Sequence, residues 1–377
     1  MPKMLDWVKR LLATTHGRST SDDDRLAPTP RLLALPPELL DHIVIFLDIP
    51  GAACLSLCSK GLRKRLAANR WQLLRPGHGY GHERKEFLLC LARDHPSLVF
   101  CYNCSRLHRG TRVGPALFSS YLPCIQYVAA RDWPGQSFEV YGGLSSYRLT
   151  FLHVQLVMAR HRDGIDRGIA IDSLSVTEVH GRERDNAWSL LSVDPKIIDN
   201  ELFLRVQHWV IFDWDKQPVF ERLRGPSICS HISKFKGKLG GSATVDLLNC
   251  QTQHIDKRAS CPTCNVLYHC VDCAVEFESD AILVGGRTVA VIITKWLNLG
   301  SGNSPTDVDW RRHLYPPFDG RPVVMAKDSP STKSIFEGQG GCSQETATRQ
   351  NAALVRDECF RDKLYHIYSD VYRDRIQ

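Results

Sequence analysis

The sequence predicts an α+β protein with an N-terminal three-helix module, an antiparallel β-rich body and a C-terminal helix. Apolar residues recur at helical spacing across residues 39–47 and again across 347–373. They alternate across residues 147–158 and 201–213, as in half-buried strands. No helical pattern of about 10 to 15 residues separates the strand patterns, so we expect antiparallel pairing.

The order of patterns divides the 377 residues into five segments. Residues 15–31 are polar and aperiodic, which predicts disorder. Residues 83–94 have helical spacing, and 169–179 and 287–296 are expected to be shorter strands. The predicted segments are a flexible leader (1–31), a helical module (32–70), a helix followed by a β-rich, cysteine-containing body (71–300), a loop-rich segment (301–346) and a C-terminal helix (347–377).

Pro36 and Pro37 predict the start of the first helix of this module, because proline is tolerated in the first turn of a helix. Pro50 and Gly51 are expected to break that helix, and Ser59 is expected to cap a later one. A unit of about 40 residues buries its apolar surface poorly, so it needs a partner surface from its own chain or from another protein. The apolar positions are Leu39, Leu40, Ile43, Phe46 and Leu47, then Ala53, Leu55, Leu57, Cys58, Leu62 and Leu66.

The stretch LPPELLDHIVIFL followed by LSLCSKGL resembles an F-box, the helical module that docks F-box proteins on the Skp-type adaptor of SCF ubiquitin ligases. The matching positions are Leu35, Pro36, Glu38, Leu39, Leu40, Ile43, Leu47, Leu55, Leu57, Lys60 and Leu62. The resemblance implies a non-catalytic receptor that binds the adaptor, and through it a cullin, while the body after residue 98 contacts a protein client. The adaptor-binding residues it implies are Leu35, Pro36, Leu39, Leu40, Ile43, Leu47, Leu55 and Leu57. The alternative is a zinc-stabilised intracellular binding protein whose N-terminal helices pack on its own body.

Composition narrows the classes of partner. The formal charge of +7, from 48 basic and 41 acidic residues, is small for this length and gives no reason to expect nucleic acid. No apolar run reaches the roughly 18 residues that span a bilayer. We therefore expect a cytoplasmic or nuclear protein whose 14 cysteines are metal ligands or buried thiols.

Cysteines and histidines are dense between residues 229 and 273. The CPTC and CVDC pairs are separated by five residues, whereas zinc ribbons separate their pairs by about 15 to 20. An easier arrangement combines one of these pairs with Cys229 and His231, giving structural zinc as the expected cofactor. Buried thiols and a redox pair are the alternatives. The candidate ligands are Cys229, His231, Cys261, Cys264, Cys270 and Cys273, with Cys250, His254 and His269 nearby.

A second, weaker group comprises Cys101, Cys104, His108 and Cys124, for which a structural turn is the alternative to a metal site. The segments CYNCSRLH, ICSH, CVDCAVEFE and ITKWLNLGSGNSPTDVDWRRH resemble elements of a group of fungal F-box proteins of unassigned substrate. This resemblance implies a recurring domain and no particular substrate. No GxSxG, HExxH, P-loop or GxGxxG motif opens a helix, so we expect no enzyme.

Overall fold

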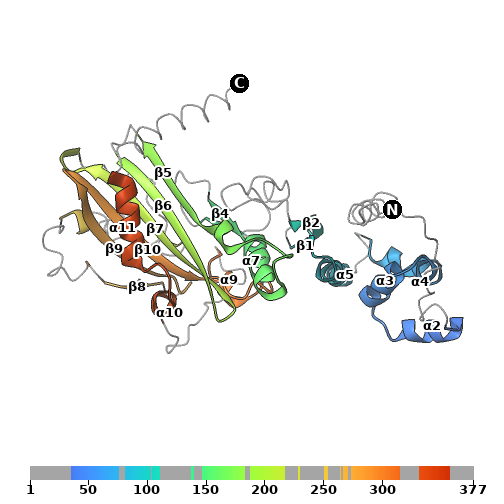
Figure 1. Ribbon diagram of the computed structural model, residues 1–377. Coiled ribbons are helices and arrows are strands. Elements are labelled where there is room, and N and C mark those ends of the chain that lie inside the picture. The colour runs from blue at the N-terminus through green and yellow to red at the C-terminus, as the bar shows by residue number, and fades with distance from the viewer. Residues whose placement is uncertain are drawn as a thin grey trace, which may run out of the picture. The chain divides into compact units, whose positions relative to one another are not determined.

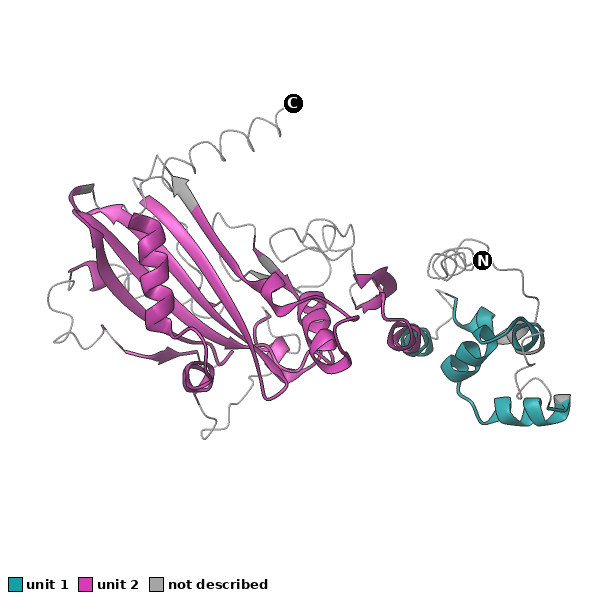
Figure 2. Ribbon diagram, viewed as in Figure 1, with its two compact units in different colours: residues 1–87 teal, residues 88–377 magenta. Residues whose placement is uncertain are grey.

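The structure, a computed structural model, is described in two compact units, Met1–Phe87 and Leu88–Gln377 (Figure 2). No helix among the described residues is long and apolar enough to cross a membrane. The described residues are 35–75, 81–102, 104–110, 137–139, 147–182, 187–216, 228–229, 250–253, 264, 266–270, 273–314 and 331–356.

The first unit contains three consecutive helices, α2 (Pro37–Ile45), α3 (Ile49–Leu57) and α4 (Lys60–Leu73), and the start of α5 (Gly81–Asp94). Ser59 Oγ accepts a hydrogen bond from the Leu62 amide at 3.0 Å, which confirms its predicted role as a cap.

The predicted helix break at Pro50 and Gly51 is wrong. Both residues lie in the first turn of α3, and the chain leaves α2 between Phe46 and Asp48. Asp48 caps α3 by accepting from the Gly51 amide at 2.7 Å, and Pro50 is tolerated because first-turn amides have no helical partner. A Cβ on Gly51 would meet Asp48 Oδ1 at 2.7 Å, so any larger residue here would displace the capping carboxylate.

The second unit is built on a six-stranded sheet whose neighbouring strands are all antiparallel (Figure 1), as the sequence predicted. In spatial order the strands are β5 (Val176–Arg182), β6 (Ala187–Ile198), β7 (Glu201–Asp213), β10 (Thr288–Asn298), β9 (Glu276–Gly285) and β8 (Tyr268–His269). Asp199 and Asn200, both at positive φ, form the two-residue turn between β6 and β7, a conformation that these residue types tolerate. The predicted strands at 201–213 and 287–296 are confirmed as β7 and β10.

Both faces of the sheet are covered. On one face, Leu204 and Val291 pack with Phe151 of α7 (Phe151–Asp163) and Trp310 of α9 (Val308–Arg311). On the other face, α10 (Thr332–Gly338) and α11 (Gln344–Arg356) lie over the sheet (Figure 1). The central strands are therefore buried on both sides.

Two small sheets complete the described strands. β1 (Leu98–Cys101) pairs with β2 (Arg106–Arg109), and β3 (Ser137–Glu139) pairs with β4 (Arg148–Thr150). The 3₁₀ helices among the described residues are η4 (Ile171–Leu174) and η6 (Trp214–Lys216).

The strand predicted over 147–158 is wrong, because only Arg148–Thr150 is a strand and α7 follows. The helix starts where the Thr150 amide donates to His153 Nδ1 at 3.1 Å. Residues 151–158 are buried at every position except Gln155, so this helix lacks the polar face that would have revealed its period.

Other predicted elements differ in part. The strand expected at 169–179 is divided between η4 and β5. The loop-rich segment 301–346 contains α9, α10 and the start of α11. The C-terminal helix is described as far as Arg356, and the remainder of its predicted range and the leader at 1–31 lie outside the described residues.

Candidate metal centres and an exposed helix face

The first candidate metal centre lies at the β1–β2 hairpin. It comprises Cys101, Cys104 and His108, whose ligand atoms all lie within 4.8 Å of one another; we call it the Cys101 cluster. Cys104 Sγ and His108 Nε2 are 3.0 Å apart. Hydrogen bonds with the thiols of Cys101 and Cys104 outweigh burial and raise the pKa of His108 to about 9. The site thus favours positive charge beside its sulfur atoms. Cys124, the fourth predicted member, lies outside the described residues.

The second candidate metal centre, the Cys229 cluster, joins residues far apart in the sequence. The sulfur atoms of Cys229, Cys270 and Cys273 all lie within 4.8 Å of one another. Cys270 and Cys273 are buried in the main core of the second unit, and Cys229 packs against it. Of the two predicted combinations, CPTC or CVDC with Cys229 and His231, the structure shows CVDC beside Cys229. His231 lies outside the described residues.

A backbone turn positions the two CVDC thiols. The Cys270 amide donates to the Val275 carbonyl at 2.9 Å, and the Ala274 amide donates to the Cys270 carbonyl at 3.0 Å. Hydrogen bonding with Cys229, then with Cys270, and then burial raise the pKa of the Cys273 thiol. Three thiols packed this closely cannot all ionise unless a cation joins them.

Lys295 adds a buried cation to the Cys229 cluster. Its side chain is 5 % exposed and Nζ donates to the Ile228 carbonyl at 3.2 Å. Burial lowers the pKa of Lys295 to about 8, and electrostatic interaction with Cys229 and Cys273 opposes that shift. Lys295 could not be recognised from the sequence, because it lies within the buried strand β10, between residues that pack in the core.

Both clusters have the donor set that zinc prefers. Zinc takes thiolate sulfur and imidazole nitrogen in a tetrahedral shell, and the described residues supply three such ligands at each cluster. Either cluster could therefore hold a metal ion.

Another pair of cysteines lies apart from these clusters. The sulfur atoms of Cys250 and Cys264 are 3.9 Å apart. Cys264 is the second cysteine of CPTC. Its pairing with Cys250 was not predicted from the sequence. Cys261 and His254 lie outside the described residues, and His269 lies on β8.

Helix α2 presents apolar side chains on two adjacent stripes. Leu40, Val44 and Leu47, the closed stripe, pack with α3 and α4 residues in the core of the first unit. Leu39, Ile43 and Phe46, the open stripe, are 49 %, 36 % and 85 % exposed. Within the helix, Leu39 and Ile43 are four residues apart, as are Leu40 and Val44, so each pair lies on one face. Phe46, the C-cap, continues the open stripe, and Leu47, just after the helix, continues the closed one.

The residues that the F-box resemblance implies for adaptor binding are exposed in some cases and buried in others. Leu39, Ile43 and Pro36 are exposed, whereas Leu40 is 1 % exposed and belongs to the internal core. Four others are half-buried, and three of them pack against that core: Leu35, Leu47, Leu55 and Leu57. The sequence pattern showed one broad apolar face, and only the tertiary fold separates its two halves.

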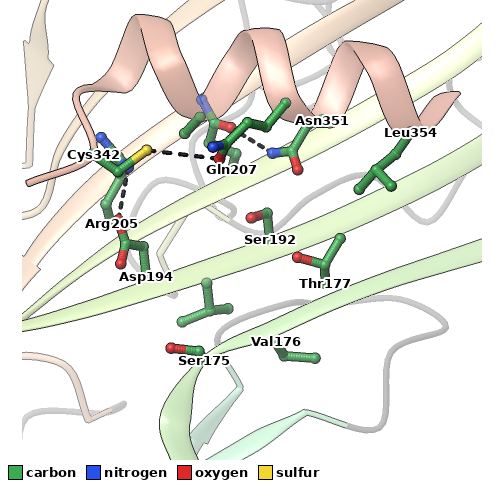
Figure 3. A pocket seen from close by; sticks show the side chains of 13 residues that line it. Ser175, Val176, Thr177, Ser192, Asp194, Arg205, Gln207, Cys342, Asn351 and Leu354 are labelled. Carbon is green, nitrogen blue, oxygen red and sulfur yellow. Dashed lines mark hydrogen bonds and ion pairs between the residues drawn. The ribbon is translucent and has the colours of Figure 1, made fainter. Parts of the chain in front are cut away.

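A polar pocket of about 410 Å³ lies between α11 and strands β5 to β7 (Figure 3). On its floor, the buried Arg205 donates to Asp194 at 2.7 Å and to Glu337 at 3.1 Å. Asn351 Nδ2 donates to Gln207 Oε1 at 2.9 Å, which joins α11 to β7. This network anchors α10 and α11 to the sheet, and the recess beside it is lined by both polar and apolar side chains.

Comparison with protein-family models, with curated proteins and with solved structures finds no match for this chain. Any functional proposal therefore depends on the residues themselves.

Proposed function

We propose that this chain is a non-catalytic substrate receptor of an SCF-type ubiquitin ligase. Helices α2 to α4 serve as an F-box that binds the Skp-type adaptor and, through it, a cullin. The second unit binds a protein client. This role needs no catalytic residue, because the receptor acts by holding the client close to the ubiquitin-charged enzyme.

The open stripe is the observation that carries the proposal. A surface helix normally has one apolar face and an opposite polar face. In α2 the closed stripe already supplies the core of the first unit, yet Leu39, Ile43 and Phe46 add a second apolar face. A contiguous exposed apolar surface marks an interaction site. The F-box resemblance identifies the partner as the adaptor.

We further propose that both metal clusters hold structural zinc. Cysteine-rich sites select soft metal ions such as zinc. The ligands of the Cys229 cluster come from two separate segments and pack in the core, so ion binding would stabilise the fold of the body. When bound, zinc would supply the positive charge that lets the thiols ionise.

The alternative is a zinc-stabilised protein with the same metal sites. In that protein the open stripe is covered by the chain's own body, whereas in an SCF receptor it is covered by the adaptor. Co-expression of the full chain with a Skp-type adaptor and cullin separates the two. We expect both partners to co-purify with the wild-type chain and to be lost with Leu39→Ala plus Phe46→Ala. Ile165→Ala, which truncates an exposed side chain of the second unit, is the matched control and should retain both. Failure of the wild-type chain to capture the adaptor would reject the F-box assignment.

A further inference from the structure

The spacing of the CPTC and CVDC pairs is unsuited to one zinc ion, because only five residues separate them. The structure places the described cysteines of these pairs with different partners. Cys270 and Cys273 lie with Cys229, whereas Cys264 lies with Cys250. Cys250 and Cys264 are not members of the Cys229 cluster.

We propose that Cys250 and Cys264 bind a zinc-type divalent ion of their own, separate from the ion of the Cys229 cluster. This inference rests on the proposed zinc chemistry of the chain. The second cysteine of CPTC and the two cysteines of CVDC then bind different ions. Each thiol releases its proton on binding.

The distance between the two sulfur atoms supports this assignment. Two thiolates at about 2.3 Å from a tetrahedral zinc ion are about 3.8 Å apart. Cys250 Sγ and Cys264 Sγ are 3.9 Å apart, and both residues are reduced thiols. A disulfide would require about 2.05 Å, so the pair is spaced for shared coordination rather than for a covalent bond.

The two centres are anchored at different points of β9. Gln251, beside Cys250, is fully buried and donates from Nε2 to Ser279 Oγ at 2.7 Å. The CVDC turn joins β8 to β9 where His269 pairs with Glu276. At the strand rise of about 3.4 Å per residue, Ser279 is about 10 Å along β9 from Glu276. The segment that carries Cys250 is thus fixed farther along the strand than the CVDC turn.

Metal stoichiometry of the purified full-length chain, measured by mass spectrometry of total zinc, tests the proposal. With one ion at the Cys101 cluster included, we expect about three zinc ions per wild-type chain. The single variants Cys264→Ser and Cys273→Ser should each hold about two, and the double variant that carries both changes should hold about one. Cys250→Ser should match Cys264→Ser. Cys342→Ser, which changes a half-buried thiol on the other face of the sheet, is the control and should keep the wild-type number.

The proposal is overturned if Cys264→Ser keeps the wild-type number of ions, or if the double variant loses no more than either single variant. If Cys264→Ser loses an ion and Cys273→Ser does not, zinc at the Cys229 cluster is rejected and the Cys250–Cys264 site is retained. If a variant fails to fold, alkylation mapping of the wild-type chain decides: Cys250 and Cys264 should be protected when metal is bound and react after chelation. Reaction of both in metal-saturated protein, or recovery of the two as a disulfide, would contradict the proposal.

Discussion

Truncating Leu39 and Phe46 together to alanine should weaken adaptor binding without unfolding the first unit. These side chains are 49 % and 85 % exposed, so a partner can bury roughly half of one and most of the other. Full burial of a leucine or phenylalanine contributes about 1.5 to 3 kcal/mol, which gives about 2 to 4 kcal/mol for the available surface of the pair. That corresponds to a loss of about 30-fold to several hundredfold in affinity.

The matched control is the closed stripe. Leu40→Ala should cost about 2 to 5 kcal/mol of stability, because Leu40 is 1 % exposed and its removal leaves a cavity. Titration of each full-length variant against purified Skp-type adaptor measures affinity, and hydrogen exchange of the α2–α4 amides measures stability. The reasoning is refuted if the Leu39 and Phe46 variant binds within about threefold of wild type, a change below about 0.7 kcal/mol. It is also refuted if this variant lowers the stability of the second unit, which would mean that the stripe packs on the body.

Three further predictions concern the second unit. Chelation of bound metal should lower its melting temperature, measured by calorimetry, by on the order of 10 °C, and an unchanged transition would argue against structural zinc. Lys295→Met should weaken zinc binding at the Cys229 cluster about 10- to 100-fold in a competition assay, because the positive charge beside the thiolates is lost. The same variant should raise the stability of the metal-free protein, because it removes a buried charge. If Lys295→Met changes the stability of the zinc-bound and the metal-free protein equally, Lys295 has no role at the metal. Glu337→Ala should lower the free energy of unfolding, measured by chemical denaturation, by about 3 kcal/mol, since Glu337 pairs with Arg205, which is 1 % exposed. The control Glu345→Ala removes an exposed ion pair and should lower it by less than about 0.5 kcal/mol.

Local patterns predicted the helices of the first unit and the strands β7 and β10. The Pro-Pro start, the Ser59 cap and the helical spacing act within a few residues, so they are visible in the sequence. The exact break between α2 and α3 was missed, because Pro50 and Gly51 suit a helix start as well as a helix end once Asp48 supplies the cap.

Elements set by tertiary burial were harder to predict. The first eight residues of helix α7 are buried at every position except Gln155, so its apolar residues showed no helical period. Strand β6 was missed, and it contains Pro195, a residue that argues against an internal strand. Pro195 lies beyond the last residue pair of the β5–β6 ladder, Val176 with Val193, so at this point β6 has a partner on one side only.

The residue types of the candidate metal ligands could be predicted from the sequence, but their partners only in part. Close spacing identified CPTC and CVDC, and the strain of a five-residue loop predicted that one of them combines with Cys229 and His231. Which of the two pairs lies with Cys229 is visible only in the structure. The pairing of Cys264 with Cys250 depends on how Gln251 docks on β9, which no local pattern contains. In the same way, the sequence located the apolar residues of α2, and the packing of α3 and α4 decided which of them are exposed.

The most direct test of the proposed function is analytical ultracentrifugation of the purified wild-type chain mixed with a purified Skp-type adaptor. The account predicts one new species with the mass of one chain plus one adaptor, and the loss of that species with Leu39→Ala plus Phe46→Ala. Two species that sediment separately at all concentrations of the wild-type mixture would contradict it.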